Sequence, residues 1–416
     1  MGFSPGRDSV RDDERRGKIV CNGCDNIRVL DKSVSMLIGS GAMELDASLS
    51  WLAMTMTPGV AARLSARLLR EFGSPEGVFR ASLPALESCR VPAPVAQALY
   101  KKQNFWRAEK EVAALRAVGA RLINWAEPEY PQSLLQIYDP PVMLYVRGDA
   151  QILNQPMLSI VGTRRPTAYG TQMTERLARD LAKRGIVIVS GLARGIDAIA
   201  HQGATAVEGR AIGVIGTGID VCYPKENKKL YERVLERGAI LSEFPLGVHP
   251  APENFPVRNR IIAGMPLGVV IVEGKQYSGS LITARLAMEF GREVFGVPGN
   301  VTQDTSFAPN QLIKQGAKLV TSAEDVIEEL PTPVRAALVQ AEAVGSEQRN
   351  LLAESELNVS QRKIYELLSV DQPRPIDDIV ETSGLNSSEV LATLFDLEMK
   401  GMVRQLPGKQ FCKVLL

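Results

Sequence analysis

The middle of the chain alternates short apolar runs with amphipathic segments. The apolar runs cover residues 158–161, 186–189, 211–215, 240–241, 268–272 and 294–297. Between most of them lie segments with the helical spacing of apolar residues, such as 171–184 and 228–238. Continuous rather than alternating apolar strands indicate that helices cover both faces of the sheet. The pattern predicts an α/β domain over residues 126–330 with a doubly wound, mostly parallel sheet.

Residues 44–125 show a different pattern, with apolar residues at helical spacings and breaks at 57–60 and 90–94. Small helices joined by glycine-containing turns predict a helical domain of the helix-hairpin-helix or SAM-like type. The hairpin of such a domain can donate backbone N–H groups to a DNA phosphate, but Ala61 stands where its second glycine is expected. A DNA contact and a purely structural packing role both stay open. Residues 1–43 lack an apolar period, and we interpret them as a disordered extension or the result of a start codon placed too far upstream.

The last part of the chain forms a separate unit. Residues 331–356 combine two prolines with no strong period, and we interpret them as a linker. Residues 357–416 predict a winged helix domain. Its predicted elements are helices at 360–368 and 376–382, a third helix capped by Asn386 and Glu389, and a hairpin over 402–414. Residues 358–416 carry 7 basic and 8 acidic residues, whereas a helix that enters the major groove should be basic. We therefore predict at most a weak DNA contact here, and an interaction module instead.

The composition is typical of a soluble globular protein. The 416 residues are enough for two or three domains, and 45% of them are hydrophobic, which is enough for a sizeable core. The apolar runs are far shorter than the ~20 residues of a membrane-spanning helix, so we expect no membrane contact and a cytoplasmic location. Five cysteines, an odd number, favour reduced thiols over a disulfide framework. Cys21 and Cys24 form one CxxC without the further ligands of a zinc site, so we expect no metal.

Positive charge is concentrated in the predicted sheet domain. The whole chain has a net charge of +1, but residues 157–320 contain 20 Lys and Arg against 14 Asp and Glu. In a Rossmann-like sheet, ligands bind beyond the carboxyl ends of the strands, so the residues that follow each apolar run form the candidate site. The candidate residues are Gly162, Thr163, Arg164, Arg165, Ser190, Gly191, Lys225, Asn227, Phe255, Arg258, Asn259, Arg260, Ser278, Gly279, Ser280 and Thr283.

These residues form a polar, basic rim with aromatic side chains among the cations. The turn at Gly162 joins a strand to a helix, and the free N–H groups of a helix start favour an anion. The rim aromatics are Tyr169, Tyr223, Phe255 and Tyr277. Cations that hold phosphates and rings that stack on bases are what single-stranded nucleic acid requires. Any one arginine could instead pair with a carboxylate such as Asp197 or Glu243.

Other chemistries lack their motifs in this chain. There is no GxxxxGK[ST] P-loop, and the glycines at 213–218 lack the spacing of the dinucleotide fingerprint, so we expect no cofactor. His201 has no evident nucleophile or second ligand, and we expect it to be packed or to cap a helix. Asp197 is expected to orient a loop rather than to remove a proton.

Seven short motifs follow one another between residues 160 and 299. They are IVGTRRPTAYG (160–170), VSGLARGIDAIAH (189–201), YPKEN (223–227), SEFP (242–245), FPVRNRIIAG (255–264), SGSLITA (278–284) and VPG (297–299). In this order they closely resemble the DprA (Smf) family of DNA-processing proteins. The flanking helical domain and the winged helix also resemble the longer members of that family.

The resemblance implies a bacterial protein of natural transformation that binds incoming single-stranded DNA without sequence preference, protects it, and loads the RecA recombinase onto it. It also implies a homodimer formed through the Rossmann-like domain and no established catalytic activity. Carried over by motif, Arg164 would be the principal phosphate contact and Lys225 another. Phe255 and residues 258–260 would line the same groove.

Two other function classes stay in competition. The fold is similar to that of nucleotide phosphoribohydrolases often labelled lysine decarboxylases, whose PGGxGTxxE turn supplies a catalytic glutamate. Placing Gly279 and Ser280 on the GT of that turn puts Thr283 where the glutamate should be, which weighs against hydrolysis. The other alternative is a partner-binding scaffold in which the winged helix is the functional part.

Overall fold

The structure is a computed structural model that describes residues 43–340, 357–369, 372–400 and 402–414. Of the predicted extension at 1–43, residues 1–42 lie outside the described residues, and Met43 is the first residue of a helix. The chain divides into two compact units. The first comprises Met1–Ala108 and Asn124–Val142, and the second comprises Glu109–Ile123 and Met143–Leu416.

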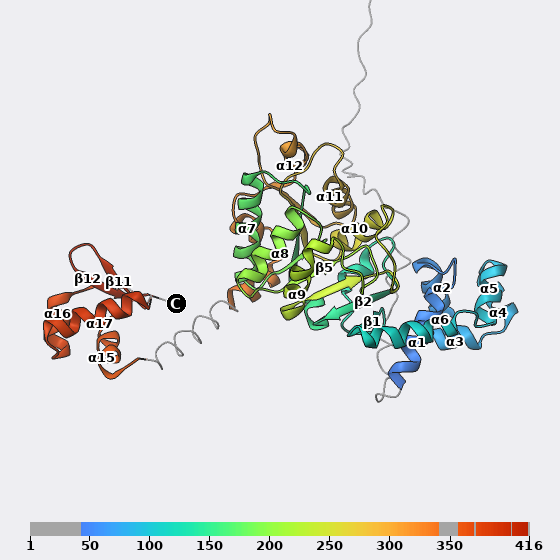
Figure 1. Ribbon diagram of the computed structural model, residues 1–416, viewed down its shortest axis with the longest axis horizontal. Helices are drawn as coiled ribbons and strands as arrows, with labels where there is room; N and C mark the ends of the chain where they lie inside the picture. Colours follow the sequence, from blue (N-terminus) through green and yellow to red (C-terminus); the bar gives the residue numbers. More distant parts are fainter. Residues whose placement is uncertain (1–42, 341–356, 370–371, 401, 415–416) are drawn as a thin grey trace, which may run out of the picture. The chain divides into compact units, whose positions relative to one another are not determined.

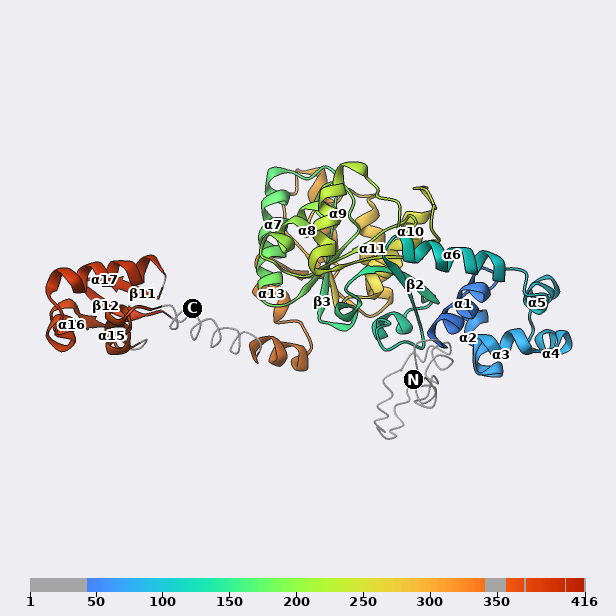
Figure 2. The same cartoon turned by 60° about the horizontal axis from the view of Figure 1, so that its bottom comes forward.

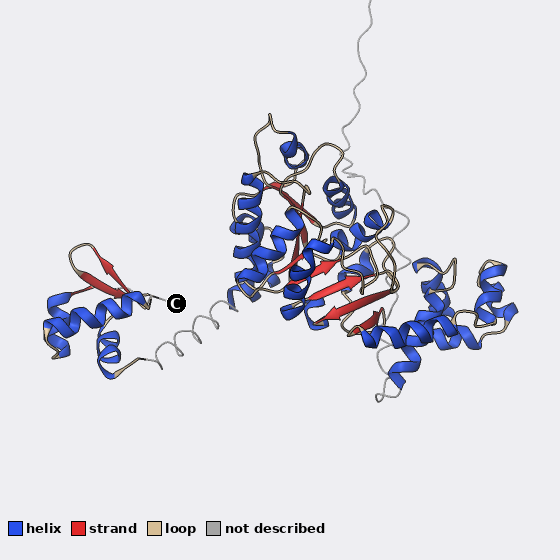
Figure 3. Cartoon of the chain, viewed as in Figure 1, coloured by secondary structure: helices blue, strands red, loops and turns tan. Residues whose placement is uncertain are grey.

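The first unit is helical, as its apolar spacing predicts (Figure 3). Its elements are α1 (Met43–Thr55), α2 (Ala62–Phe72), α3 (Pro75–Arg80), α4 (Leu83–Ser88), α5 (Ala93–Tyr100), the start of α6 (Phe105–Ala117) and the 3-10 turn η2 (Gln132–Gln136). Ser74 and Ser82 cap α3 and α4, because each hydroxyl accepts a bond from a backbone N–H and a proline follows in the first turn. In the turn after α1, Thr57 Oγ1 donates to Ala53 O at 2.9 Å and accepts from Asn104 Nδ2 at 3.1 Å.

The second unit contains a nine-stranded sheet in the order β1-β2-β6-β5-β4-β3-β7-β8-β9 (Figure 1). The strands are β1 (Ala120–Asn124), β2 (Met143–Gly148), β3 (Met157–Val161), β4 (Val187–Ser190), β5 (Ala211–Val214), β6 (Ala239–Ser242), β7 (Gly268–Ile271), β8 (Glu293–Gly296) and β9 (Lys318–Leu319). From β6 to β9 all neighbouring strands run parallel, and β2 pairs antiparallel with β6. The predicted doubly wound, mostly parallel sheet is confirmed.

The strand order reverses at β3. The chain proceeds from β3 through β4 and β5 to β6 on one side, and then returns to place β7 on the other side of β3. The connecting helices are α7 (Ala168–Lys183), α8 (Ile196–Ala206), α9 (Lys228–Arg237), α10 (Asn254–Gly264), α11 (Gly279–Glu289) and α12 (Phe307–Lys314). Right-handed crossovers place α7, α8 and α9 on one face of the sheet (Figure 2) and α10 and α11 on the other. The space beyond the carboxyl ends of β3 and β7 is the switch point at which such folds bind ligands.

The strand interiors explain the continuous apolar runs. Every residue of β3, β4, β5, β6 and β7 is buried. The buried serine hydroxyls are satisfied by carbonyls, since Ser159 Oγ donates to Ile262 O at 2.7 Å and Ser242 Oγ donates to Thr217 O at 2.6 Å. No helix within the described ranges is long and apolar enough to cross a membrane.

Two segments differ from their predicted places. β1, which the sequence assigned to the helical domain ending at residue 125, is the edge strand of the sheet beside β2. The described part of the predicted linker is helical over residues 332–340. Pro333 is compatible with this helix because it lies in the first turn, where its missing N–H is not needed.

The C-terminal domain has the predicted three helices and hairpin. Its elements are α15 (Val359–Leu367), β10 (Arg374–Pro375), α16 (Ile376–Ser383), α17 (Ser387–Met399), β11 (Val403–Leu406) and β12 (Gln410–Lys413). Asn386 and Glu389 form the predicted capping box at the start of α17. A separate apolar core lies between the helices and the hairpin and includes Ile364, Leu394 and Phe411. This domain is therefore a winged helix.

Candidate nucleic-acid interface

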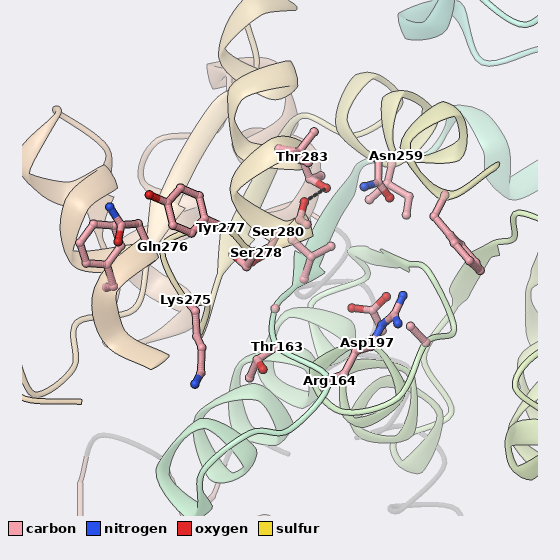
Figure 4. Close-up of a pocket in the computed structure, with 18 of the residues that line it drawn as sticks. Thr163, Arg164, Asp197, Asn259, Lys275, Gln276, Tyr277, Ser278, Ser280 and Thr283 are labelled. Carbon is pink, nitrogen blue, oxygen red and sulfur yellow. Dashed lines mark hydrogen bonds between the residues drawn. The ribbon is translucent and has the colours of Figure 1, made fainter. Parts of the chain in front are cut away.

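A groove of about 1470 Å³ lies at the switch point (Figure 4). Its lining comes from the turn after β3, the start of α8, the first part of α10, the loop after β7 with the start of α11, and α12. In Figure 4, Arg164 and Asp197 lie on one side of the groove, and Gln276 and Tyr277 lie on the other. Of the predicted site residues, the groove brings together Gly162, Thr163, Arg164, Phe255, Arg258, Asn259, Ser278, Gly279, Ser280 and Thr283.

The turn after β3 is held by backbone bonds on both sides. Thr163 N donates to Glu273 O at 2.8 Å, and Ile196 N donates to Thr163 O at 3.1 Å. A Cβ on Gly162 would lie 2.6 Å from Ile196 Cγ1 and 2.8 Å from Glu273 O, so only glycine fits between the two segments. The close approach fixes the position from which Arg164 projects.

The start of α7 is occupied by a protein carboxylate. Glu273 is 3% exposed, and it accepts hydrogen bonds from Thr167 N at 2.9 Å and Thr167 Oγ1 at 2.5 Å. The N-terminus of this helix therefore already has an anion beside it. Positive charge at this turn is presented by the arginine side chains, and the binding of a phosphate here stays a prediction.

Arg164 lies over an aromatic ring at the edge of the groove. Its guanidinium carbon is 5.7 Å from the centre of the Phe255 ring, and that ring lies 5.9 Å from the ring of Tyr223 at an angle of 34°. The Arg164 side chain is exposed and forms no ion pair with any residue in the described part of the chain. It is therefore free to receive a phosphate.

Arg258 lines the groove, but its guanidinium is turned into the protein. It is 6% exposed, and Nη1 donates to Gly191 O at 2.8 Å and to Val214 O at 2.5 Å. Burial lowers the pKa of Arg258. Burial also raises the pKa of the neighbouring Asp197, an effect that the charge of Arg258 opposes. Arg258 thus connects the carboxyl ends of two strands, and it is not available as a phosphate ligand in this arrangement.

Asp197 orients the loop after β4, as expected. Its Oδ2 accepts a hydrogen bond from Gly191 N at 3.1 Å. A Cβ on Gly191 would lie 2.6 Å from this oxygen, so glycine is required by the close approach. Gly191 lines a small side recess that shares Arg164 and Phe255 with the groove.

Two further predicted residues, Ser190 and Asn227, hydrogen-bond to backbone segments near the groove. Ser190 is fully buried, and its Oγ donates to Ile160 O at 2.7 Å on the neighbouring strand. Asn227 Nδ2 donates to Leu192 O at 2.9 Å and so connects the start of α9 to the loop after β4. Neither side chain lines the groove.

Three predicted cations lie outside the groove lining. Arg260 Nη2 donates to Glu243 Oε1 at 2.6 Å, and both side chains of this ion pair are largely buried. Arg165 and Lys225 are exposed, next to groove or recess residues in sequence but not among those lining it. Their contact with a nucleic acid stays a prediction.

The start of α11 forms another wall with small hydroxyl side chains. Ser278 Oγ and Ser280 Oγ lie 2.9 Å apart, and nothing lies within 4 Å of a Cβ built on Gly279, so the backbone is open to a ligand. Thr283 is 2% exposed, and its Oγ1 donates to Gly279 O at 3.2 Å. The position that would hold the glutamate of a phosphoribohydrolase thus carries a hydroxyl already engaged with the helix backbone.

The far wall of the groove was predicted only in part, because Tyr277 is one of the expected rim aromatics whereas α12 was not expected to contribute. This wall is formed by the loop from Lys275 to Tyr277 and by α12, from which Phe307 and Lys314 line the groove. The Tyr277 ring is 91% exposed. Lys275 lies three positions after the end of the predicted strand 268–272, which is a signal in the sequence. The α12 residues carry no such signal because a long loop separates them from β8.

His201 and the cysteines were the remaining candidates for catalysis or metal binding. His201 is fully buried on α8, as the packed interpretation expected, and burial lowers its pKa to about 4. It is therefore neutral at physiological pH. Within the described ranges no group of three or more His, Cys, Asp and Glu could hold a metal, and Cys21 and Cys24 lie outside those ranges.

Comparison with known proteins agrees with the fold and its order of domains. A family model described as DNA recombination-mediator protein A matches residues 121–331, and one described as the DprA winged helix domain matches residues 351–409. The chain belongs to the DprA family. The DNA processing protein DprA of Bacillus subtilis is 42% identical over 271 residues, which cover 64% of this chain and 91% of that protein. Protein Smf of Synechocystis sp. is 32% identical over 391 residues, which cover 87% of this chain and 97% of that protein.

A solved structure supports the same assignment. The X-ray structure of DNA processing protein A (DprA) from Streptococcus pneumoniae matches with a TM-score of 0.59 and 34% sequence identity. The match covers 71% of this chain and 99% of the pneumococcal chain. The motifs between residues 160 and 299 thus predicted the family correctly.

Proposed function

We propose that the groove binds single-stranded DNA without sequence preference. The observation that carries this proposal is Arg164, an exposed cation over the Phe255 ring at the switch point of the sheet. A cation next to a ring combines a phosphate contact with a stacking surface for a base. Because every base has a π-face, stacking of this kind is tolerant of sequence.

The dimensions and lining of the groove support a strand rather than a single nucleotide. Its volume of about 1470 Å³ exceeds the roughly 300–1,000 Å³ of small-molecule pockets. Cations line both walls of the groove. Arg164 lies on the wall formed by the turn after β3, and Lys275 and Lys314 lie on the wall formed by the loop after β7 and α12. Tyr223 and Tyr277 also line the groove, so their rings add to the stacking surface of Phe255. We propose that successive phosphates follow these cations, with Lys225 as a further contact outside the groove.

We propose binding rather than catalysis at this site. A hydrolase would need a positioned acid or base that is free to exchange protons with the substrate. Asp197 is engaged with Gly191 N and Arg258, and Thr283 replaces the carboxylate of the competing enzyme class. These engagements support a groove that holds nucleic acid and leaves it intact.

The family supplies the wider role that we propose. A DNA recombination-mediator protein would protect incoming single-stranded DNA and load the RecA recombinase onto it during natural transformation in the cytoplasm. We further propose that the chain acts as a homodimer through its Rossmann-like domain. RecA-dependent strand exchange with oligonucleotides precoated by a single-strand-binding protein, with and without this chain, tests the loading step. If the intact protein does not stimulate strand exchange, the loading role is refuted, but the proposal that the groove binds DNA is not affected.

A titration of oligo-dT against a duplex of the same length, repeated over a range of salt concentrations, tests the binding proposal. We expect a strong preference for the single strand and a linear fall of log affinity with log salt. The variant Lys225→Glu should weaken binding and flatten this dependence. Equal affinity for the duplex, or no binding together with release of base from nucleoside monophosphates, would overturn the proposal in favour of the enzyme class.

A further inference from the structure

The winged helix domain exposes an apolar stripe on α17. Leu391, Phe395 and Met399 are 53%, 62% and 74% exposed. They are spaced four residues apart, so they lie on one face of the helix over two turns. The buried residues of the same helix are Val390, Thr393, Leu394 and Leu397, which face the domain core. The stripe therefore lies away from the core.

Acidic residues flank the stripe on both sides. At about 100° per residue, Glu398 lies just before Leu391 around the helix axis, and Asp396 lies beyond Met399. The remaining charges of α17 are Glu389, which closes the capping box, and Lys400 at the C-cap. The exposed face of this helix is thus apolar in the middle and negative at its margins.

This composition does not suit the nucleic-acid contact that the same helix makes in many winged helix proteins. A helix in the major groove needs hydrogen-bond donors for bases and cations for phosphates. Asp396 and Glu398 would instead repel the phosphate backbone. A cluster of exposed large apolar side chains with a polar rim is typical of a protein-binding surface.

We propose that this stripe binds an amphipathic helix of another protein, whose apolar face is flanked by Lys or Arg. Phe395 at the centre would be the anchor, because aromatic residues near the middle of an interface carry much of its energy. The flanking carboxylates select a basic partner. A second copy of this chain fits poorly, since a two-fold contact centred on Phe395 would bring the acidic margins of both copies together.

Two synthetic peptides test the proposal against the full-length chain by fluorescence anisotropy. Both peptides are about 20 residues long and carry leucines at helical i, i+3 and i+4 spacing, with lysines beside the leucines in one and glutamates in the other. We expect the lysine peptide to bind at least about ten-fold more tightly than the glutamate peptide. Phe395→Asp should abolish this binding, and Asp396→Lys should reduce the preference for lysine.

Matched variants on α15 provide the controls. Val359→Asp makes the same kind of change at an apolar side chain that is 87% exposed, and Glu366→Lys makes the same charge change as Asp396→Lys. Neither should alter peptide binding, and circular dichroism should show all four variants folded. Oligo-dT affinity should be unchanged by Phe395→Asp, which separates this surface from the groove.

Three results would overturn the proposal. Equal affinity for the two peptides, or no binding of either peptide, would show that the stripe does not select a basic amphipathic helix. Loss of self-association in Phe395→Asp during sedimentation would assign the stripe to a second copy of the chain. Tight binding of a 20-base-pair duplex (roughly two helical turns) that Phe395→Asp abolishes would assign the helix to DNA.

Discussion

The guanidinium carbon of Arg164 lies 5.7 Å from the centre of the Phe255 ring. The two side chains come from different parts of the fold, the turn after β3 and the first turn of α10, and they meet at the edge of the groove. A charge and a ring contribute to strand binding through different forces. Phosphate contacts depend on salt because they release counterions, whereas base stacking depends on it little. The two contributions can therefore be separated by measurement.

Reversal of the Arg164 charge should weaken single-strand binding and reduce its salt dependence. Each phosphate contact on a single strand contributes about 0.7 to the slope of log affinity against log salt, so Arg164→Glu should lower the slope by about that amount or more. Lys183→Glu is the matched control, since it makes the same change of charge at an exposed residue in the last turn of α7, outside the groove lining. Equal effects of the two variants would mean that only the overall field matters and that Arg164 makes no direct contact.

Substitution of Phe255 should weaken binding without changing the salt slope. Phe255→Leu keeps an apolar side chain against Tyr223 but removes the stacking face. The loss should be about 1–3 kcal/mol, roughly 5- to 150-fold in affinity, as for other base-stacking aromatics. A filter-binding series at several salt concentrations would measure affinity and slope together. A parallel fall of the slope would show that Phe255 acts by positioning Arg164.

Arg258 should affect stability more than binding. Its guanidinium is buried between Gly191 O and Val214 O and compensates the buried Asp197. Arg258→Met leaves that carboxylate without its nearby positive charge, which should cost about 3–5 kcal/mol of unfolding free energy. Urea unfolding of the single variant and of Arg258→Met with Asp197→Asn measures this. The double variant should be less destabilised than the sum of the single variants; strict additivity would show that the two groups do not interact.

Arg258 and Arg260 show where sequence analysis of the site reaches its limit. Two residues apart on a helix are about 200° apart around its axis, so one side chain must face the sheet when the other faces outward. The motif predicted that both lie near the groove, but only packing decides that Arg258 points inward and that Arg260 pairs with Glu243. The same holds for Ser190, whose β-strand position gives no indication that its hydroxyl bonds to Ile160 O.

The strands and the main turn were predictable because they follow from local patterns. Continuous apolar runs mark strands covered on both faces, and Gly162 marks the turn that approaches Glu273 too closely for a Cβ. The hydrogen bonds between Glu273 and Thr167, the N-cap of α7, were not predictable, because the two residues are 106 positions apart. The α12 wall was missed for the same physical reason. Long loops bring it to the groove, and loop paths depend on tertiary packing.

The far wall should affect long strands more than short ones. Tyr277 is 91% exposed and lies across the groove from Arg164 (Figure 4). If a DNA strand contacts Arg164 first, the double variant Tyr277→Ala with Lys314→Glu should reduce the affinity for a longer oligo-dT. The affinity for a very short oligo-dT should hardly change. Arg164→Glu should reduce both. Fluorescence titrations over a series of oligo-dT lengths would show this, and an equal loss at every length would place Tyr277 and Arg164 at the same nucleotide.

His201 should make the protein less stable as the pH falls below neutrality. Burial lowers its pKa from 6.5 to about 4, so between these values the unfolded chain binds a proton that the folded chain does not. The contribution of His201 to the free energy of unfolding is therefore complete above pH 6.5. It is lost as the pH falls toward 4, by about 3 kcal/mol for a pKa shift of this size. Asp197 acts in the opposite direction, because its raised pKa makes the folded chain hold a proton more tightly.

His201→Leu, which keeps the buried volume apolar, should remove the effect of His201 only. Unfolding by urea at several pH values between 4 and 7 would show a flatter or inverted profile for the variant, and identical profiles would mean that His201 does not titrate differently in the two states.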